Sequence, residues 1–340
     1  MDKALIISDM VEKKVGRGED SDPILFRYNN TILIGVFDGM GGAGGAECLS
    51  DFSHDGIDMT KAYVGSRIVR DAIENSVHNN PEILLEPNFS DCLVGIIKTR
   101  YMEENEKYPP KSKGGLRSKL IKEYPTTLAM SCITKHSDQY VIDSYWAGDS
   151  RNYLWTPNGL FQISKDDLKG NLDPMQNLRE DAPMSNCVQA DAPFRINHKQ
   201  INLADREKFV VISATDGCFG YYPSPMDFEN ALFESLKNSL SLTEFKDKLS
   251  SAFANVTADD FSYSIAAFGF ANFNEFKSSL RYLKRLLKKY ISKRRGLEQE
   301  VRKSKEKLAR LEESLRKNMT SSWSTYRGSY LKYMEQNEER

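Results

Sequence analysis

The segment YVIDSYWAGDSRNYLWTPNGLFQIS, residues 140–164, constrains the fold more than any other part of the sequence. It holds three short runs of β-branched and aromatic residues, separated by the turn formers Gly148, Asp149, Asn158 and Gly159. A parallel pair of strands needs a long crossover connection, whereas an antiparallel pair needs only a tight turn. We therefore predict an antiparallel sheet rather than a doubly wound parallel one.

The same alternation of strand-like and helix-like segments continues through residues 1–270. Further strand-like runs lie at 31–37, 126–134, 208–215 and 261–270, and helix-like segments at 43–78, 91–107 and 227–253. The segment 168–200 carries Pro, Gly and Asn and is interpreted as a loop. We predict one large domain over residues 1–270.

Residues 271–340 have a different composition, with 19 Lys and Arg against 9 Asp and Glu, a net charge of +10. Subtraction from the whole-chain totals leaves 28 against 39, a net charge of −11, for residues 1–270. From Phe273 to Leu315, apolar residues follow an alternating spacing of three and four, interrupted at Arg294 and Ser304. This pattern predicts a basic helical extension, a coiled coil that self-associates or binds a partner helix through 273–318. Alternatively, the basic extension folds back on the acidic domain.

The five cysteines are an odd number and contain no CxxC pair, so we predict reduced thiols in a cytoplasmic protein. No run approaches the ~20 apolar residues of a membrane span, and the N-terminus is too acidic for a secretory signal. We find no nucleic-acid-binding motif. Neither nucleic acid nor a membrane is therefore expected as a partner.

Acidic residues recur where the predicted strands end. Asp38 in GVFDGMGGAGG (35–45) follows a run of β-formers and precedes glycines, which let the backbone turn its carbonyl toward a ligand. Asp216 in VVISATDG (210–217) repeats this pattern. Other acids near predicted strand ends are Glu19, Asp20, Asp149, Asp259 and Asp260. An all-oxygen group without matching His or Cys favours Mg²⁺ or Mn²⁺ over zinc.

The order of these motifs resembles the metal-dependent serine/threonine protein phosphatases, the type-2C or PPM family. The motifs are ED, GVFDGMGG, TTLAM, AGDSRNYLW, VVISATDG and DDFSYSIAAF, and they span residues 4–270. Met40 after the Asp-Gly pair is similar to a bacterial DGMGG-type branch. The resemblance implies an α+β fold, a β-sandwich of two antiparallel sheets flanked by helices in α-β-β-α order.

The resemblance also implies a binuclear Mg²⁺ or Mn²⁺ centre. Asp38 would bridge the two ions, the Gly39 carbonyl and Glu19 would support one of them, and Asp216 and Asp259 would hold the other. Asp149 matches the position of a third, weaker ion, which Asp216 could share. Catalysis would then depend on Asp38 and Asp216 through metal-bound water that attacks phosphorus.

The sequence departs from the family pattern at two places. Val15 occupies the position of an arginine that grips the substrate phosphate, so we predict that Arg17 replaces it, with Lys14 as the alternative. The final motif reads Asp259-Asp260 where the family has Asp-Asn. We assign Asp259 as the ligand and keep Asp260 as its rival.

We therefore predict a Mg²⁺- or Mn²⁺-dependent phosphatase that hydrolyses phosphoserine or phosphothreonine in a protein, such as the target of a Ser/Thr kinase. The segment 168–200 is expected near the site, where it would set specificity. One alternative is a catalytically weak, phosphatase-like scaffold that binds phosphoproteins and holds partners through its coiled-coil tail. Another is a coiled-coil regulatory protein whose body only carries the tail.

Overall fold

The computed structural model describes residues 4–53, 57–109, 121–170, 173–179, 182–281 and 283–334. The chain separates into two compact units, Met1–Arg285 and Leu286–Arg340. The predicted domain boundary, after residue 270, precedes helix α7 (Phe273–Ser279), which is part of the first unit. The two units are described separately below.

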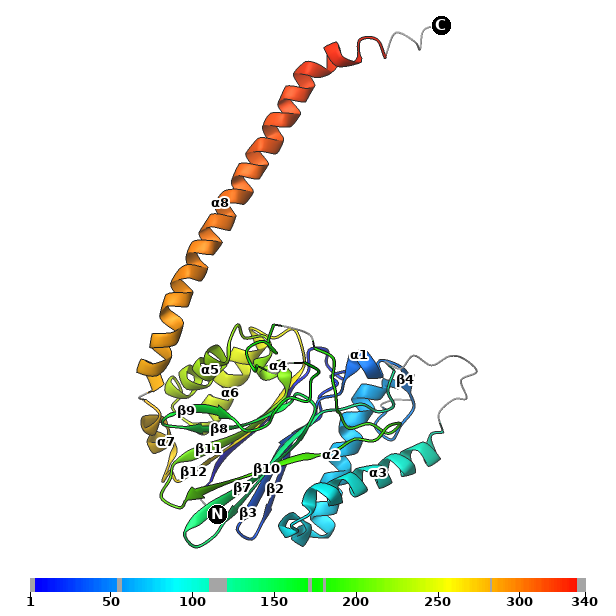
Figure 1. The fold of residues 1–340 in the computed structure, drawn as a ribbon, viewed down its shortest axis with the longest axis vertical. Coiled ribbons are helices and arrows are strands. Elements are labelled where there is room, and N and C mark those ends of the chain that lie inside the picture. Colours follow the sequence, from blue (N-terminus) through cyan, green and yellow to red (C-terminus); the bar gives the residue numbers. More distant parts are fainter. Residues whose placement is uncertain are drawn as a thin grey trace. The chain divides into compact units, whose positions relative to one another are not determined.

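Two five-stranded antiparallel sheets form the centre of the first unit (Figure 1). The first sheet has the order β1 (Leu5–Val11), β12 (Phe261–Phe268), β11 (Phe209–Ala214), β8 (Arg151–Thr156) and β9 (Gly159–Gln162). The second has the order β10 (Asn197–Ala204), β7 (Gln139–Ala147), β6 (Leu128–Lys135), β3 (Thr31–Val36) and β2 (Ile24–Tyr28). The three strands predicted within 140–164 are β7, β8 and β9, but the chain leaves the second sheet after β7 and enters the first at β8.

Helices cover the outer faces of both sheets (Figure 1). Helices α2 (Lys61–Asn79) and α3 (Phe89–Lys107) share an apolar core with the second sheet. Helices α5 (Pro225–Lys237) and α6 (Leu242–Ala254) lie on the first sheet, where Phe228 and Phe253 stack. This is the predicted α-β-β-α sandwich.

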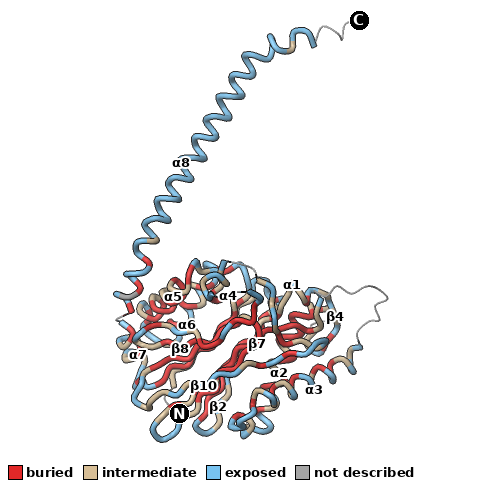
Figure 2. The backbone as a smooth tube through the Cα atoms, in the orientation of Figure 1, coloured by how far each residue is buried: buried red, intermediate tan, exposed pale blue. Residues whose placement is uncertain are grey.

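Strand β3 shows how the two cores meet, because every residue from Thr31 to Val36 is buried. Successive side chains of a strand point to opposite faces. Ile32 and Ile34 therefore pack between the sheets, while Leu33 packs under α2 and α3. Figure 2 shows this burial in red along the central strands. Strand β3 ends two residues before Asp38, so the rigid core fixes where that aspartate lies.

Some predicted element boundaries are wrong. The predicted helix 43–78 is a short helix α1 (Gly41–Gly44), a small pair of strands β4 (Glu47–Cys48) and β5 (Met59–Thr60), and then α2. Helix α2 begins at Lys61 because the Thr60 side chain caps it, accepting a hydrogen bond from the Tyr63 N–H. The predicted helix 227–253 is interrupted by a second cap, Ser241, which starts α6.

Strands β1, β2 and β10 were not predicted, and part of β10 falls in the predicted loop 168–200. All three lie at sheet edges, and β10 has the polar sequence NHKQINLA. Edge strands need no apolar residues on their exposed side, so their hydrophobic alternation is weak. The remaining connections in the first unit are a 3₁₀ helix, Pro81–Leu85, and the short helix α4 (Asp216–Phe219).

Helix α8 (Leu283–Leu331) contains 49 residues and makes up most of the second unit. The predicted heptad pattern does not run along one helix from Phe273, because α7 ends at Ser279. Phe276, Leu280 and Leu283 are core residues of the first unit. From Leu297 to Tyr330, the apolar residues of α8 are exposed, as the pale blue tube of Figure 2 shows. None of the helices in the described ranges is both long and apolar enough to cross a membrane.

Candidate metal centre

Asp38 lies just beyond β3, in a turn that the backbone holds at both ends. Its carbonyl oxygen accepts hydrogen bonds from the Thr127 N–H at 2.8 Å and from Thr126 Oγ1 at 2.7 Å. The next amide, Gly39 N–H, donates to the carbonyl of Glu19 at 3.2 Å. The turn thus joins three predicted motifs, those that contain Glu19, Asp38 and Thr126.

The glycines after Asp38 are required by close contacts. A Cβ atom on Gly39 would lie 2.3 Å from the Ala62 carbonyl oxygen, and one on Gly41 would lie 1.9 Å from Glu19 Oε2. Neither position has room for a side chain. Glycine therefore lets the backbone approach the Glu19 carboxylate directly.

Asp149 and Asp216 come from the other sheet and its connections. Asp149 lies in the turn between β7 and β8, after Gly148, whose φ of 97° is a conformation that favours glycine. Asp216 is the first residue of α4, directly after β11. A Cβ on Gly217 would lie 1.9 Å from the Asp260 carbonyl oxygen, which explains the Asp-Gly pair here as well.

These side chains line one open cavity of about 390 Å³. Every residue of the predicted metal set lines it: Glu19, Asp38, Gly39, Asp149, Asp216 and Asp259. Asp260 lines it too. The sandwich therefore brings together acids that are up to 241 residues apart in sequence.

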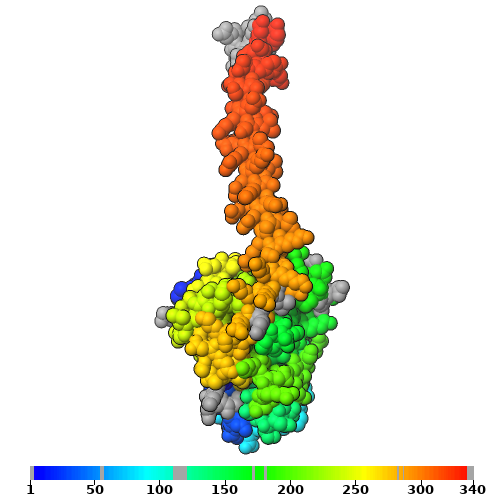
Figure 3. All heavy atoms as spheres, turned by 90° about the vertical axis from the view of Figure 1, so that its left-hand side faces the viewer, coloured from blue at the N-terminus to red at the C-terminus, as the bar shows by residue number. Residues whose placement is uncertain are grey.

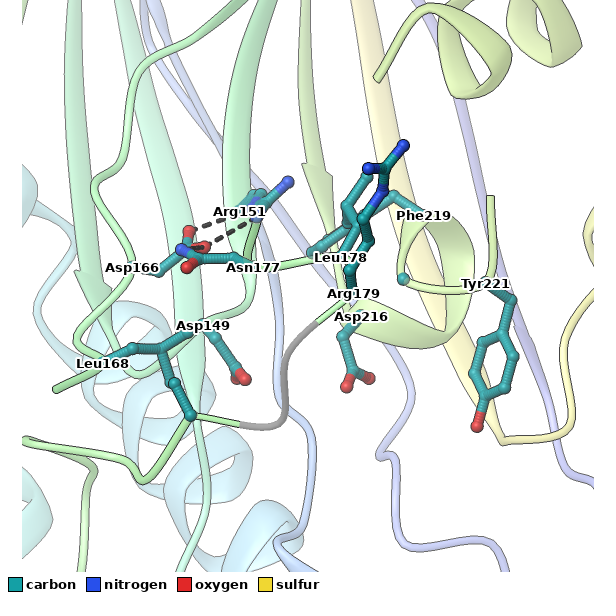
Figure 4. Close-up of a pocket in the computed structure, with 12 residues that line it drawn as sticks. Asp149, Arg151, Asp166, Leu168, Asn177, Leu178, Arg179, Asp216, Phe219 and Tyr221 are labelled. Carbon is teal, nitrogen blue, oxygen red and sulfur yellow. Dashed lines mark hydrogen bonds and ion pairs between the residues drawn. The ribbon is translucent and has the colours of Figure 1, made fainter. Parts of the chain in front are cut away.

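A second cavity of about 340 Å³ adjoins the first, since Asp149 and Asp216 line both. Figure 4 shows these two carboxylates pointing to the same side, below the paired Arg151 and Asp166. Leu168 and residues 177–179 also line this second cavity. The segment 168–200 thus borders the acidic residues.

The carboxylate of Asp260 is already engaged by backbone. Its Oδ1 accepts a hydrogen bond from the Lys13 N–H at 2.6 Å, and its Oδ2 accepts one from the Glu19 N–H at 2.7 Å. Asp259 is more exposed, and among the described residues its Oδ1 accepts one hydrogen bond, from the neighbouring Asp260 N–H at 2.9 Å. Asp260 therefore fastens the loop that carries Glu19, while Asp259 has more freedom to face a ligand.

Arg17 and Lys14 are exposed, and neither is among the described residues that line the two cavities. Their predicted contact with phosphate is therefore not apparent in this arrangement. Arg179, which the sequence motifs do not single out, is exposed and lines the second cavity beside Asp216 and Tyr221. In the sequence, the indication for Arg179 was its position in the segment 168–200, which was expected to lie near the site.

Arg151 of the AGDSR motif is buried and forms an ion pair with Asp166. Its Nε and one terminal nitrogen donate to the two carboxylate oxygens of Asp166 at 2.9 and 2.6 Å. The guanidinium also lies over the Phe219 ring, 4.4 Å from its centroid. Asp166 in turn accepts a hydrogen bond of 2.8 Å from Asn177 Nδ2. The pair thus links the turn of Asp149 with the segment that carries Arg179.

The carboxyl groups of the site strongly affect one another's protonation. Burial and the nearby Asp20, Asp216 and Asp149 raise the pKa of Asp38 well above its ordinary value. Burial and Asp216 raise the pKa of Asp149 to about 7, and burial and Asp259 raise that of Asp216 to about 6. Without a cation, the site holds more negative charge than its surroundings stabilise.

Asp20 is a member of the site to which the sequence assigned no role. Its side chain is 2% exposed and accepts a hydrogen bond of 2.9 Å from Thr215 Oγ1. Burial, followed by the proximity of Asp216, raises its pKa to about 8. The ED motif gave a signal for this residue, but only the fold shows that it lies behind Asp38 and Asp216 rather than in the cavity.

The residues fit a pair of hard divalent cations by their chemistry. The donors are carboxylate oxygens and the Gly39 carbonyl, the ligands that Mg²⁺ and Mn²⁺ prefer. Gly41 leaves a gap that a single Cβ would fill, beside the Glu19 carboxylate. Among the described residues, no group of three or more His, Cys, Asp or Glu is arranged so that it could hold a metal ion as it stands. The fit therefore rests on the donor set and its unbalanced charge.

Known structures share this two-layered antiparallel sandwich. The serine/threonine phosphatase PstP/Ppp of Mycobacterium tuberculosis has 16% identity and a TM-score of 0.52, covering 78% of this chain and 98% of that chain. Stp1 from Staphylococcus aureus has 18% identity and a TM-score of 0.51, covering 78% of this chain and 94% of that chain. No protein-family model and no curated protein sequence matches the chain.

The chain therefore has the fold of bacterial serine/threonine phosphatases of the type-2C kind, which confirms the resemblance read from the motifs. At these identities the likeness establishes the fold, and a fold alone does not determine activity. The DGMGG-type branch stays a prediction.

Proposed function

We propose that this protein is a Mg²⁺- or Mn²⁺-dependent protein phosphatase that hydrolyses phosphoserine and phosphothreonine. The observation that carries the proposal is the convergence of Asp38, Asp216 and Asp259 on one cavity. Their carboxylates come from three separate segments, and burial together with neighbouring carboxylates raises the pKa of each. Such a cluster has no evident structural use, because its charges destabilise one another.

Glu19, Asp38 and the Gly39 carbonyl would hold one ion, and Asp38, Asp216 and Asp259 the other, with Asp149 available to a third. Ions held there would supply an acidified water as the nucleophile, so the chain itself needs none. An oxygen of water would form a bond to phosphorus, and the bond from phosphorus to the serine or threonine oxygen would break. That oxygen would take the proton that the attacking water gives up and leave as a hydroxyl group.

The chain's own residues position this chemistry. Thr126 and Thr127 fix the turn of Asp38, and Asp260 fixes the loop of Glu19. Because Asp260 is occupied by two backbone donors, the proposal keeps Asp259 as the ligand. A doubly charged phosphate group also needs a cation near these acids. We assign that role to Arg179, which lines the adjoining cavity, in preference to Arg17.

The test is phosphate release from a phosphothreonine peptide by the full chain in Mn²⁺, compared with Asp216→Asn and Asp138→Asn. Asp138 is an exposed control at the hairpin between β6 and β7, at the opposite end of β6 from Asp38. We expect Asp216→Asn to abolish turnover and Asp138→Asn to retain it. Equal activity of the wild type and Asp216→Asn would contradict the proposal. Absent turnover with intact peptide binding would favour the phosphatase-like scaffold.

A further inference from the structure

Helix α8 carries a long apolar stripe that is exposed to solvent. Leu297, Val301, Leu308, Leu311 and Leu315 are between 53 and 61% exposed. The stripe then continues through Met319, Trp323, Tyr326 and Tyr330, where Trp323 and Tyr330 make a ring contact at 5.5 Å. Figure 1 draws α8 as one continuous coil, and Figure 3 shows its atoms in orange and red. A helix of 49 residues extends roughly 70 Å, so an exposed stripe of this length requires a long partner.

The spacing of the stripe defines a heptad register. With Val301, Leu308 and Leu315 at a positions, Leu297, Ser304 and Leu311 fall at d positions. The preceding a position is Arg294, whose Nε lies 3.4 Å from Glu298 of its own helix, so its charge is partly balanced there. After Leu315 the pattern takes consecutive steps of four residues to Trp323, which is a stutter that locally unwinds a coiled coil without breaking it.

The charges beside the stripe identify the partner. In a parallel, in-register pair of helices, each g residue faces the e residue of the next heptad on the other helix. In this register the facing pairs are Lys293 with Glu298, Glu300 with Lys305, and Lys307 with Glu312 of the second copy. All three pairs are of opposite sign, and twofold symmetry makes each of them occur twice. The helix is thus complementary to itself.

An antiparallel pair fits the same helix less well. The antiparallel register that opposes the most charges places Glu300 against Lys307 and Glu298 against Lys305 of the second copy, which is two kinds of pair against three in the parallel register. That register sets the aromatic end of the stripe, from Trp323 onward, against residues near 280. Leu280 is already buried within the first unit, so Trp323 would meet the globular body instead of another stripe. A parallel pair covers the whole stripe.

We propose that α8 forms a parallel, in-register, two-stranded coiled coil with α8 of a second copy of this chain. This inference is independent of the phosphatase proposal, because none of the residues it uses lines the acidic cavity. It makes the protein a homodimer with both phosphatase-like bodies joined at the same end of the coiled coil.

The first test is the mass of the full chain in solution by light scattering across a concentration series. We expect twice the chain mass of 38.7 kDa. Leu311→Asp places a charge in the stripe and should give the monomer mass, whereas Ala309→Asp, the same change on the outer b position, should leave the dimer. A monomeric wild type, or a dimer that Leu311→Asp does not affect, would overturn the proposal. Thermal unfolding of the body in each variant confirms that it remains folded.

The second test distinguishes the two orientations by charge reversal. Lys305→Glu alone should weaken the dimer by about tenfold, since two symmetry-related exposed pairs change from attraction to repulsion. Glu300→Lys added to it restores opposite charges in the parallel register and should recover the wild-type dissociation constant. In the antiparallel register, the double variant keeps both pairs repulsive. A double variant that is weaker than the single one would therefore overturn the parallel arrangement.

Discussion

Thr215 Oγ1 donates a hydrogen bond of 2.9 Å to Oδ2 of Asp20, which lies 195 residues away in the sequence. The bond joins the N-terminal ED motif to the TDG motif and holds Asp20 behind Asp38 and Asp216. Asp20 therefore places a carboxyl group behind the site without lining the cavity. In metal sites, such supporting residues orient the ligands and strengthen ion binding.

Asp20→Asn should weaken Mn²⁺ binding by about 10- to 100-fold, because the variant keeps an acceptor for Thr215 but removes the carboxylate that can become negative behind the ligands when an ion binds. The apparent affinity can be measured by calorimetric titration of the EDTA-stripped protein. The exposed neighbour Asp22 supplies a matched control, Asp22→Asn, whose Mn²⁺ affinity should match that of the wild type. If both variants bind Mn²⁺ equally well, Asp20 has no supporting role.

Metal-free protein should become less stable as the pH rises. Burial and neighbouring acids raise the pKa of Asp20 to about 8 and that of Asp149 to about 7, above the unfolded value of 3.8. A raised pKa means that the folded state binds the proton more tightly, so the stabilisation is complete below the unfolded pKa and is lost as the pH rises through the folded pKa. The free energy of unfolding in EDTA should therefore fall between about pH 5 and about pH 8.

Urea titrations in EDTA at the two pH values measure this effect. Asp20→Asn removes one of the titrating groups and should reduce the fall. Saturating Mn²⁺ should also reduce it, since the ion balances the carboxylates. A stability that is the same at both pH values in EDTA would show that these acids are not held close together.

Arg151→Ala should lower the free energy of unfolding by about 3–5 kcal/mol, because it leaves the buried carboxylate of Asp166 without its ion pair. Lys237→Ala removes an exposed pair with Glu234 on α5 and should cost about 1 kcal/mol or less. Urea denaturation of both variants measures the difference. Similar small losses for the two would mean that the Arg151 pair does not brace the site.

Arg179→Ala should raise the KM for a phosphopeptide by about tenfold or more, since charged hydrogen bonds contribute about 1.5–3 kcal/mol. Arg179→Lys keeps the positive charge but loses the planar guanidinium that can donate two hydrogen bonds to one phosphate. Its KM should therefore lie between those of the wild type and Arg179→Ala. Steady-state kinetics of these variants beside Arg17→Ala separates the two assignments. A raised KM for Arg17→Ala with a normal Arg179→Ala would restore the prediction made from the sequence.

The resemblance of the motifs predicted the sandwich, and the recurrence of acids at strand ends predicted which acids share one cavity. Asp38 and Asp216 each follow an apolar strand and precede a glycine, and the fold needs those glycines for close backbone contacts. The choice between Asp259 and Asp260 was harder, since it depends on backbone donors at Lys13 and Glu19. Those contacts exist only after the chain termini of the body come together.

Other features could not be predicted because no local pattern encodes them. Arg151 pairs with Asp166 across a turn, and Arg179 lies beside Asp216 only because the segment 168–200 folds over the sheet ends. The heptad pattern correctly indicated a long helix. It also included Phe276 and Leu280, which belong to the body, because a core-facing helix and a coiled coil share the same spacing.

The central claim is that this cavity catalyses metal-dependent phosphate release. The most direct measurement strips the full chain with EDTA, removes the chelator, and records phosphate release from a phosphothreonine peptide as Mn²⁺ or Mg²⁺ is returned. The account predicts no turnover in the stripped protein and saturable recovery with added ion. Folded protein that releases no phosphate at any ion concentration, or that works equally well in EDTA, would contradict it.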